Sequence, residues 1–487
     1  MKTQITTKYN VIYVMAISAV AAIGGLLFGF DSSVISGVIE PMGHHYQLTP
    51  SQTGWAVSNV VIGCVIGCLS AGYLSDKFGR KRALVVTAAL FIVSILGTAW
   101  TNSFEAFVWF RILGGFAIGT ASVISPVYIA EVAPRKMRGT AITMHMICCV
   151  GGQMVVLITN YLIAKEMSDI QLDAVGWRWM LSSALVPCVL FFILVGFIPE
   201  TPRWNILNGR DDKALKTLTK ISNATHAEQV FKEIKDNFAL EAKAALASHS
   251  HRQGKFGKNS WIFISIGIGL ALFNILTGIN VVQYFGPTLM LNITSSLKEA
   301  MFMTIFLAAL QFCGVIVGMS LIDKVGRTIL LKFGSFFAFI FLLYTFVAFY
   351  YKFPGWWSVI GLFGFMFTFG VSWAQVVWTV IGEIFPTRLR AIGTGISISA
   401  MWAGSFLTTQ TFPLMNKSQY LVDKFHGGLP LLIFAVCTLI SLVFVKKCVP
   451  ETKGIALEKM EKVVLSKFNR KAVTDEVYLP NEAEEAK

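Results

Sequence analysis

An aspartate interrupts an apolar, glycine-rich stretch near the start of the chain, "AAIGGLLFGFDSSVISGVIE" at residues 21–40. A charged side chain at the centre of a membrane helix costs about 2.5–3.5 kcal/mol on insertion scales, so Asp31 is expected to serve a function. Arg111, in the apolar stretch "FRILGGFAIG", is expected to lie at the same depth. A neighbouring cation favours the ionised acid and desolvation favours the protonated acid, so a conformational change can tip such a pair. The two residues predict proton exchange, with a static buried ion pair as the structural alternative.

Charged phrases recur in the same order in the two halves of the chain. An even number of apolar runs separates the copies, which is the pattern of parallel repeats in transporters. Arginine can pair with both oxygens of a carboxylate, so the phrases predict charge pairs of fixed geometry at helix ends. They are "DKFGR" at Asp76 and "DKVGR" at Asp323, "EVAPRKMRG" at Glu131 and "EIFPTRLRA" at Glu383, and "PETPR" at Pro199 and "PETKG" at Pro450.

The composition is that of a helical membrane protein. Hydrophobic residues make up 55% of the 487 residues and charged residues only 14%, and the mean hydropathy is +0.64. Most apolar runs reach the roughly 20 residues that a helix needs to cross a bilayer. We therefore predict an all-α membrane protein with twelve transmembrane helices in two six-helix parallel repeats. The predicted limits are 11–39, 54–75, 83–101, 105–130, 139–163, 177–198, 261–290, 299–322, 329–351, 356–383, 391–415 and 428–449.

The net charge of +14 comes from basic residues that gather on one side of the membrane if the spans alternate. This is the positive-inside pattern, so it requires no nucleic-acid partner and places both termini in the cytoplasm. The expected location is the cell membrane, plasma or inner. The expected parts are an N-terminal bundle (1–200), short cytoplasmic linker helices (201–260), a C-terminal bundle (261–455) and a cytoplasmic tail with a disordered end (456–487).

These motifs resemble the sugar porters of the major facilitator superfamily, which include glucose facilitators and bacterial proton–xylose and proton–galactose symporters. The resemblance covers residues 20–455, and "PETPR", "GIN" with a following tyrosine, and "PETKG" are its specific phrases. It implies the major facilitator fold, with substrate bound near the midplane between halves that alternate access. It also implies that Asp31 is the proton-coupling acid and Arg111 its partner, because glucose facilitators carry a neutral residue at the position of Asp31.

Two further sets of residues are expected to function. Sugar hydroxyls need hydrogen-bond partners and sugar C–H faces stack on aromatic rings, and the resemblance implies matching side chains between the halves. The expected substrate-binding residues are Phe28, Gln153, Asn274, Asn280, Tyr284, Gln311, Trp378 and Trp402. The repeated charges predict a cytoplasmic gate that ties the halves together, with interfacial anchoring as the alternative. The gate residues are Asp76, Arg80, Glu131, Arg138, Glu200, Arg203, Asp323, Arg327, Glu383 and Arg390.

Several positions depart from the family pattern. Two adjacent glutamines usually stand four and three residues before the glycine of "GIN", and here Asn274 and Ile275 take their places. Gln375 replaces the proline of the tenth-span P-x-x-W phrase, Met401 replaces a glutamine before the eleventh-span tryptophan, and Gln311 stands where asparagine is frequent. The loss of amides is expected to weaken recognition of glucose or xylose hydroxyls unless other glutamines replace them.

The glycines of the spans are expected to allow close helix approach or local unwinding, and Pro287 is expected to help break the seventh span near its outer end. Gly278, Gly286 and Pro287 are candidate hinges in this span. Gly114 and Gly115, in the fourth span, are instead expected to allow close approach of neighbouring helices, because small residues favour such contacts in membranes.

The sequence therefore predicts a proton–monosaccharide symporter that acts on a pentose or hexose by alternating access, and a monomer is expected. A uniporter for a sugar or a polyol such as inositol is the main alternative, and a non-transporting sugar sensor is the third. Nothing in the sequence supports catalysis, since it contains no phosphate loop and no nucleophile elbow. The cysteines lie mostly in apolar runs without metal-ligand spacing, so no metal or cofactor is expected.

Overall fold

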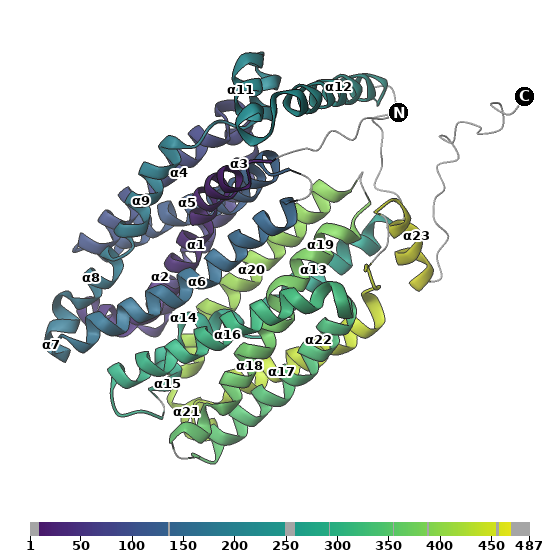
Figure 1. Ribbon diagram of the computed structural model, residues 1–487. Coiled ribbons are helices and arrows are strands. Elements are labelled where there is room, and N and C mark those ends of the chain that lie inside the picture. The colour runs from purple at the N-terminus through teal and green to yellow at the C-terminus, as the bar shows by residue number, and fades with distance from the viewer. Residues whose placement is uncertain are drawn as a thin grey trace, which may run out of the picture.

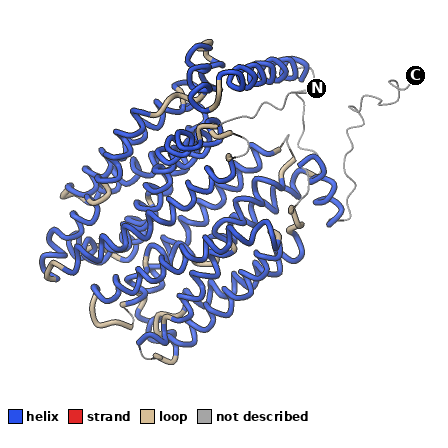
Figure 2. Tube along the Cα trace, in the orientation of Figure 1, coloured by secondary structure: helices blue, strands red, loops and turns tan. Residues whose placement is uncertain are grey.

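The computed structural model describes residues 9–134, 137–248, 259–291, 293–353, 355–386, 389–453 and 457–468. Within these ranges the chain forms helices joined by short connections and contains no strand (Figure 2). The long apolar helices run roughly side by side, and the helices α11, α12 and α23 lie at one end of them (Figure 1).

The first half of the chain forms six apolar segments, two of them interrupted. Their helices are α1 (Val11–Tyr46), α2 (Pro50–Ser58), α3 (Val60–Phe78), α4 (Arg80–Trp100), α5 (Phe104–Val132), α6 (Arg138–Lys165), α7 (Asp169–Gln171), a π-helical segment (Leu172–Gly176), α8 (Trp177–Ser182) and α9 (Leu185–Phe197). The helices that follow are α10 (Pro202–Leu207), α11 (Asp211–Ile221) and α12 (Ala224–Ser248). These three pack against the first half, where Trp204 donates its indole N–H to the carbonyl of Asp76 at 2.8 Å.

The second half repeats the arrangement. Its helices are α13 (Ser260–Leu276), α14 (Ile279–Tyr284), α15 (Gly286–Met290), α16 (Leu297–Val325), α17 (Arg327–Tyr350), a 3-10 turn (Gly355–Ser358), α18 (Ile360–Val371), α19 (Trp373–Ile384), α20 (Arg390–Asn416), α21 (Gln419–Phe425), α22 (Leu429–Cys448) and α23 (Leu457–Lys467). We call the side on which α1 begins and α22 ends the termini side.

Eleven helical segments of the described chain are long and apolar enough to cross a membrane. The remaining predicted span, 391–415, coincides with α20, a 27-residue helix that is long enough to cross but contains many Ser, Thr and Gly residues. Large apolar side chains point outward from these segments, among them Trp109 and Val186, which are 71% and 75% exposed. Such a belt of exposed apolar surface fits contact with lipid tails.

The seventh predicted span is broken twice in the structure. Gly278 separates α13 from α14 with a left-handed φ of 89°, a conformation that side-chain-bearing residues rarely adopt. A second break at Phe285 separates α14 from α15, immediately before Gly286 and Pro287. The prediction of interruption near these residues is therefore correct, and α14 becomes a short unit of its own that carries Asn280 and Tyr284.

Glycines let α3 and α5 touch backbone to backbone. A Cβ added to Gly67 would lie 2.3 Å from the carbonyl oxygen of Phe116, whereas a Cβ added to Gly72 would meet nothing within 4 Å. Gly115 of α5 makes the reciprocal approach, with the carbonyl oxygen of Val60 at 2.0 Å from its added Cβ. These contacts explain why small residues recur along both helices.

Substitution of Gly67 by Ala is expected to lower stability by about 1–3 kcal/mol, because the methyl group has no space and the two backbones must separate. Gly72→Ala lies on the same helix and is the matched control, with no expected loss. Thermal unfolding of the purified proteins in detergent measures both. Equal unfolding temperatures for the two variants would mean that the α3–α5 contact is not as close as described.

The two halves touch on the side opposite the termini. Ser58 donates to Gln410 Oε1 at 2.8 Å, and Gln410 Nε2 donates to the carbonyl of Ser51 at 3.1 Å. Thr288 donates to Glu40 Oε1 at 3.1 Å on the same side. Because Ser58 and Glu40 belong to the first half and their partners to the second, this side of the interface is closed by direct hydrogen bonds.

Candidate functional site

Asp31 and Arg111 form a buried ion pair between α1 and α5. One terminal guanidinium nitrogen of Arg111 lies 3.1 Å from Asp31 Oδ1 and 3.0 Å from Oδ2. The side chains are only 4% exposed for Arg111 and 13% exposed for Asp31. The Nε of Arg111 is buried and has no hydrogen-bond partner among the described residues. The pairing expected from the sequence is present, and Arg111 keeps donor capacity that Asp31 does not use.

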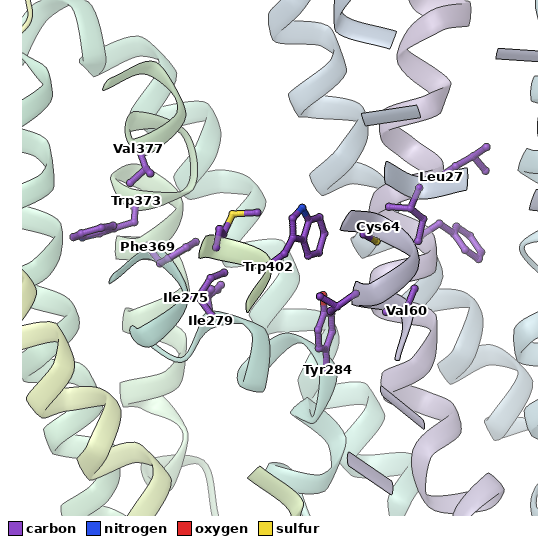
Figure 3. Close-up of a cluster of buried hydrophobic side chains, with 14 of the residues drawn as sticks. Leu27, Val60, Cys64, Ile275, Ile279, Tyr284, Phe369, Trp373, Val377 and Trp402 are labelled. Carbon is purple, nitrogen blue, oxygen red and sulfur yellow. The ribbon is translucent and has the colours of Figure 1, made fainter. Parts of the chain in front are cut away.

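A pocket beside this pair is lined by both halves of the molecule. Phe28 and Asp31 reach it from α1, Tyr284 from α14 and Trp402 from α20. The rings of Phe28 and Trp402 are 6.4 Å apart at their centroids. Trp402 and Tyr284 lie between the helices of the second half and the helix that carries Val60 and Cys64 (Figure 3). An acid–base pair and three aromatic residues thus meet at one place.

Sequence reasoning missed part of this lining. Ser32 and Ile35 follow Phe28 and Asp31 on the same face of α1, at helical spacings of three and four residues. That spacing was the available signal. The other lining residues that were not predicted are Val57, Val60, Cys64 and Ile118.

All four predicted substrate-binding amides, Gln153 included, lie outside the pocket lining, and the other three are hydrogen-bonded within the second half. Asn280 donates to Ser405 at 2.6 Å, and Asn274 donates to the carbonyl of Trp373 at 3.1 Å. Gln311 accepts a hydrogen bond from Gln283 at 3.0 Å. The structure therefore does not bring these side chains to the pocket, and their role in binding stays a prediction.

Two buried glutamines retain free amide groups. Gln153 on α6 is 8% exposed, and its carbonyl oxygen has no partner among the described residues. Gln375 on α19 is equally buried, and neither its oxygen nor its nitrogen has a partner there. A buried amide without a partner costs free energy, so such groups are candidates to bind a ligand. Trp378, by contrast, is 39% exposed and does not line the pocket.

The sequence model of the family described as "Sugar (and other) transporter" matches residues 17–464. The chain belongs to this sugar transporter family. It is 33% identical to the D-xylose-proton symporter of Escherichia coli strain K12, over 93% of this chain and 96% of that protein. It is also 33% identical to the arabinose-proton symporter of Bacillus subtilis strain 168, over 94% and 97%. The inward-open structure of the E. coli xylose transporter superposes with a TM-score of 0.80, at 32% identity, over 92% of this chain and 99% of that one.

The family assignment confirms the predicted fold class. The sugar transporter has the twelve-helix major facilitator fold. In this fold α20 is the eleventh transmembrane helix, although it is less apolar than the eleven segments identified above. It is a multi-pass membrane transporter and not an enzyme.

The repeated phrases of the sugar transporter build two similar charge networks on the termini side. In the first half Arg80 lies 3.0 Å from Asp76 and 3.1 Å from Glu131. In the second half Arg327 lies 3.1 Å from Asp323 and 3.4 Å from Glu383. Each pair belongs to one half, so these contacts brace the helix ends within a half and do not join the halves in this conformation.

In each half, a glycine of one repeated phrase leaves space for the glutamate of another. Gly79 and Gly326 precede the two arginines, and both have positive φ values, 97° and 105°. A Cβ at Gly79 would lie 2.2 Å from the carboxylate of Glu200, and a Cβ at Gly326 would lie 2.9 Å from that of Glu451. The missing side chain lets each carboxylate accept backbone N–H groups at the start of the next helix.

Three predicted gate residues stand apart from these networks. Arg203 is exposed at the start of α10, and Arg138 at the start of α6 is half-buried with an unpartnered Nε. The side chain of Arg390 lies outside the described residues. The gate as a whole stays a prediction.

The pKa values of two repeat-related acids are shifted in opposite directions. Burial raises the pKa of Glu200, although the N–H groups of Thr201, Lys81 and Arg80 oppose the rise. Burial also acts to raise the pKa of Glu451, but backbone N–H groups, that of Lys453 foremost, outweigh it and hold the pKa below its usual value of 4.5. Glu451 therefore stabilises the fold above pH 4.5 and loses this contribution as the pH falls through its lowered pKa. The ionised form of Glu200 instead opposes folding.

At pH 7, Glu451→Gln is expected to lower the unfolding temperature, because an ionised acceptor of several N–H groups is lost. Glu200→Gln is expected to leave it unchanged or raise it. Thermal unfolding of both variants between pH 4 and 8 measures the difference. A larger loss in Glu200→Gln than in Glu451→Gln at neutral pH would contradict the assignment.

Proposed function

We propose that the protein is a proton-coupled symporter for a monosaccharide, a pentose or a hexose, and that it works by alternating access. The observation that carries the proposal is the position of the Asp31–Arg111 pair on the wall of the pocket that also holds Phe28, Tyr284 and Trp402. A proton site and an aromatic sugar site that share one wall can influence each other directly. The names of the xylose and arabinose relatives support the same function.

In this proposal Asp31 takes up and releases the proton, and the ion pair with Arg111 depends on the charge of Asp31. Protonation removes the negative charge that holds the guanidinium, so the donors of Arg111 become free to turn toward water or substrate. Loss of the proton restores the ion pair. Coupling requires that the protein changes conformation readily only when both the proton and the sugar are bound or when neither is bound. Because the proton site and the sugar site share one wall of the pocket, binding of each ligand can affect the other.

The aromatic rings stack on the faces of the sugar, and buried amides bind its hydroxyls. Gln153 and Gln375 have amide atoms without a partner among the described residues, but they lie outside the pocket lining in this conformation. In this proposal they contact the substrate in other states of the cycle, as do Asn274, Asn280, Gln311 and Trp378. This rearranged polar lining favours a substrate with fewer or differently placed hydroxyl contacts than glucose. A polyol or sugar carried by uniport, with Asp31 as a static pair, is the second candidate.

Alternating access follows from the contacts between the halves. The hydrogen bonds of Gln410 and Thr288 close the side opposite the termini, and the likeness to an inward-open structure supports an opening toward the termini side. We propose that both termini are cytoplasmic, that the protein acts as a monomer in the cell membrane, and that the bundles 1–200 and 261–455 rock about the pocket. The charge networks around Arg80 and Arg327 then form the inner gate in the outward-facing state.

Uptake of labelled compounds into cells that lack other sugar transporters tests this function. Xylose, arabinose, glucose, galactose, fructose and inositol are offered separately, with and without a proton ionophore. Accumulation of one monosaccharide above its external concentration, abolished by the ionophore, supports symport. Entry that never exceeds the external concentration would support the uniporter instead, and no entry of any compound would contradict both.

A further inference from the structure

A second cavity lies on the termini side of the first half. It is bordered by the start of α4, the segment after α9, and the helices α10 and α11, and it encloses about 1020 Å³ with its open mouth included. The charged residues that line the cavity are basic except for a single acid, Glu200. The basic lining residues are Lys81, Arg82, Arg210, Lys213, Lys216 and Lys220.

The helix α11 presents its cations to this cavity as a row. Lys213, Lys216 and Lys220 are spaced by three and four residues, so they lie on one face of the helix. The opposite face is fixed against the protein by the buried side chains of Leu218 and Ile221. The helix therefore cannot turn its lysines away without exposing apolar surface.

The described part of the chain does not neutralise the positive charge of the cavity. Within the described residues, none of the six basic side chains forms an ion pair with a carboxylate. Glu200 is occupied by the backbone N–H groups of Arg80 and Lys81 at 3.0 and 3.2 Å, and Asp211 at the start of α11 pairs with Lys235 of α12 at 2.5 Å. Like charges gathered without partners repel one another, so the cavity favours an anion.

The cavity also lies at the level where a lipid head group would reach it. Arg82 stands in the first turn of α4, and Glu200 follows α9, whose apolar segment ends at Phe197. Arg210 is held over the ring of Trp204 at 5.0 Å, which fixes one wall of the cavity. Basic pockets at the ends of membrane helices attract anionic lipids of the cytoplasmic leaflet.

We propose that this cavity binds a phosphate-bearing anion, supplied by an anionic lipid head group or by a soluble phosphate ester. Lysine and arginine donors suit the oxygens of a phosphate group. The bound anion would contact Lys81 and Arg82, which directly follow Arg80 in the sequence, so it would lie near the termini-side network in which Arg80 pairs with Glu131. The proposal does not depend on which substrate the protein carries.

The test compares two triple variants of the full-length protein purified in detergent. Lys213→Gln, Lys216→Gln and Lys220→Gln remove the row on α11. Lys446→Gln, Lys447→Gln and Lys462→Gln remove the same charge from exposed positions of α22 and α23, outside the cavity. Phosphatidylglycerol, inorganic phosphate and glucose 6-phosphate are titrated while the unfolding temperature is measured.

Phosphatidylglycerol is expected to stabilise the wild type and the control triple variant alike, and the α11 variant should need at least a tenfold higher concentration. Stabilisation by the lipid alone identifies a head-group site, and stabilisation by the soluble phosphates as well identifies a phosphate-ester site. If the α11 triple variant unfolds without ligand, the single variant Lys216→Gln replaces it. Equal responses of the α11 and control variants, or no response of the wild type, would overturn the proposal.

Discussion

Asp31→Asn is expected to abolish uphill accumulation of the sugar and to leave exchange of sugar across the membrane intact. Asparagine has nearly the shape of aspartate and can still accept a hydrogen bond from Arg111, but it cannot take up a proton. A membrane potential of 100 mV supplies about 2.3 kcal/mol per proton, enough for a roughly 50-fold accumulation ratio. Without proton coupling this ratio falls to about one.

The measurement combines accumulation of labelled sugar in energised cells with counterflow in vesicles preloaded with unlabelled sugar. Glu166→Gln is the control, because Glu166 is an exposed acid at the end of α6, outside the pocket. It should accumulate sugar as the wild type does. Normal accumulation by Asp31→Asn would make the Asp31–Arg111 pair a static structural contact, and loss of counterflow as well would mean that the variant fails at binding rather than at coupling.

Trp402→Ala is expected to raise the KM for sugar uptake by roughly 10- to 100-fold. Trp402 is only 7% exposed and lines the same pocket as Asp31. Loss of its ring removes the stacking surface for the sugar, which corresponds to about 1.4–2.8 kcal/mol of binding free energy. Trp402→Phe keeps an aromatic face and should restore most of the affinity.

Trp109→Ala provides the matched control for this prediction. Trp109 lies on α5 close to Arg111, but its side chain is 71% exposed on the outer surface of the helix. Its removal should change neither KM nor expression. Initial rates of uptake over a range of sugar concentrations measure both variants, and an unchanged KM in Trp402→Ala would exclude this pocket as the sugar site.

The buried charge pair could be predicted from the sequence because charges are rare within the spans. Asp31 and Arg111 stand out from their apolar surroundings, and counting from the helix ends places them at one depth. The repeated phrases likewise identified arginines and acids at the helix ends, and the structure gives Arg80 and Arg327 equivalent partners in the two halves. What the repeat could not indicate was whether each pair lies within a half or between halves, because that depends on the conformation.

The positions of the polar side chains around the pocket depend on helix breaks that periodicity does not encode. The tenth span is interrupted at Ser372, with φ −118° and ψ −84°, so the face on which Trp378 lies cannot be counted from α18. Trp378 is exposed in the structure, while Trp402, on the uninterrupted α20, reaches the pocket. Motif matching identified both tryptophans as candidate sugar-binding residues. Only the backbone geometry shows which of the two reaches the pocket in this conformation.

Sugar-induced alkalinisation tests proton coupling most directly. Cells that express the protein are suspended in lightly buffered medium without other carbon sources, and the external pH is recorded when the transported sugar is added. The account predicts a rise in external pH with the wild type and none with Asp31→Asn. Sugar entry without any pH change in the wild type would contradict it and would assign the protein to the uniporters.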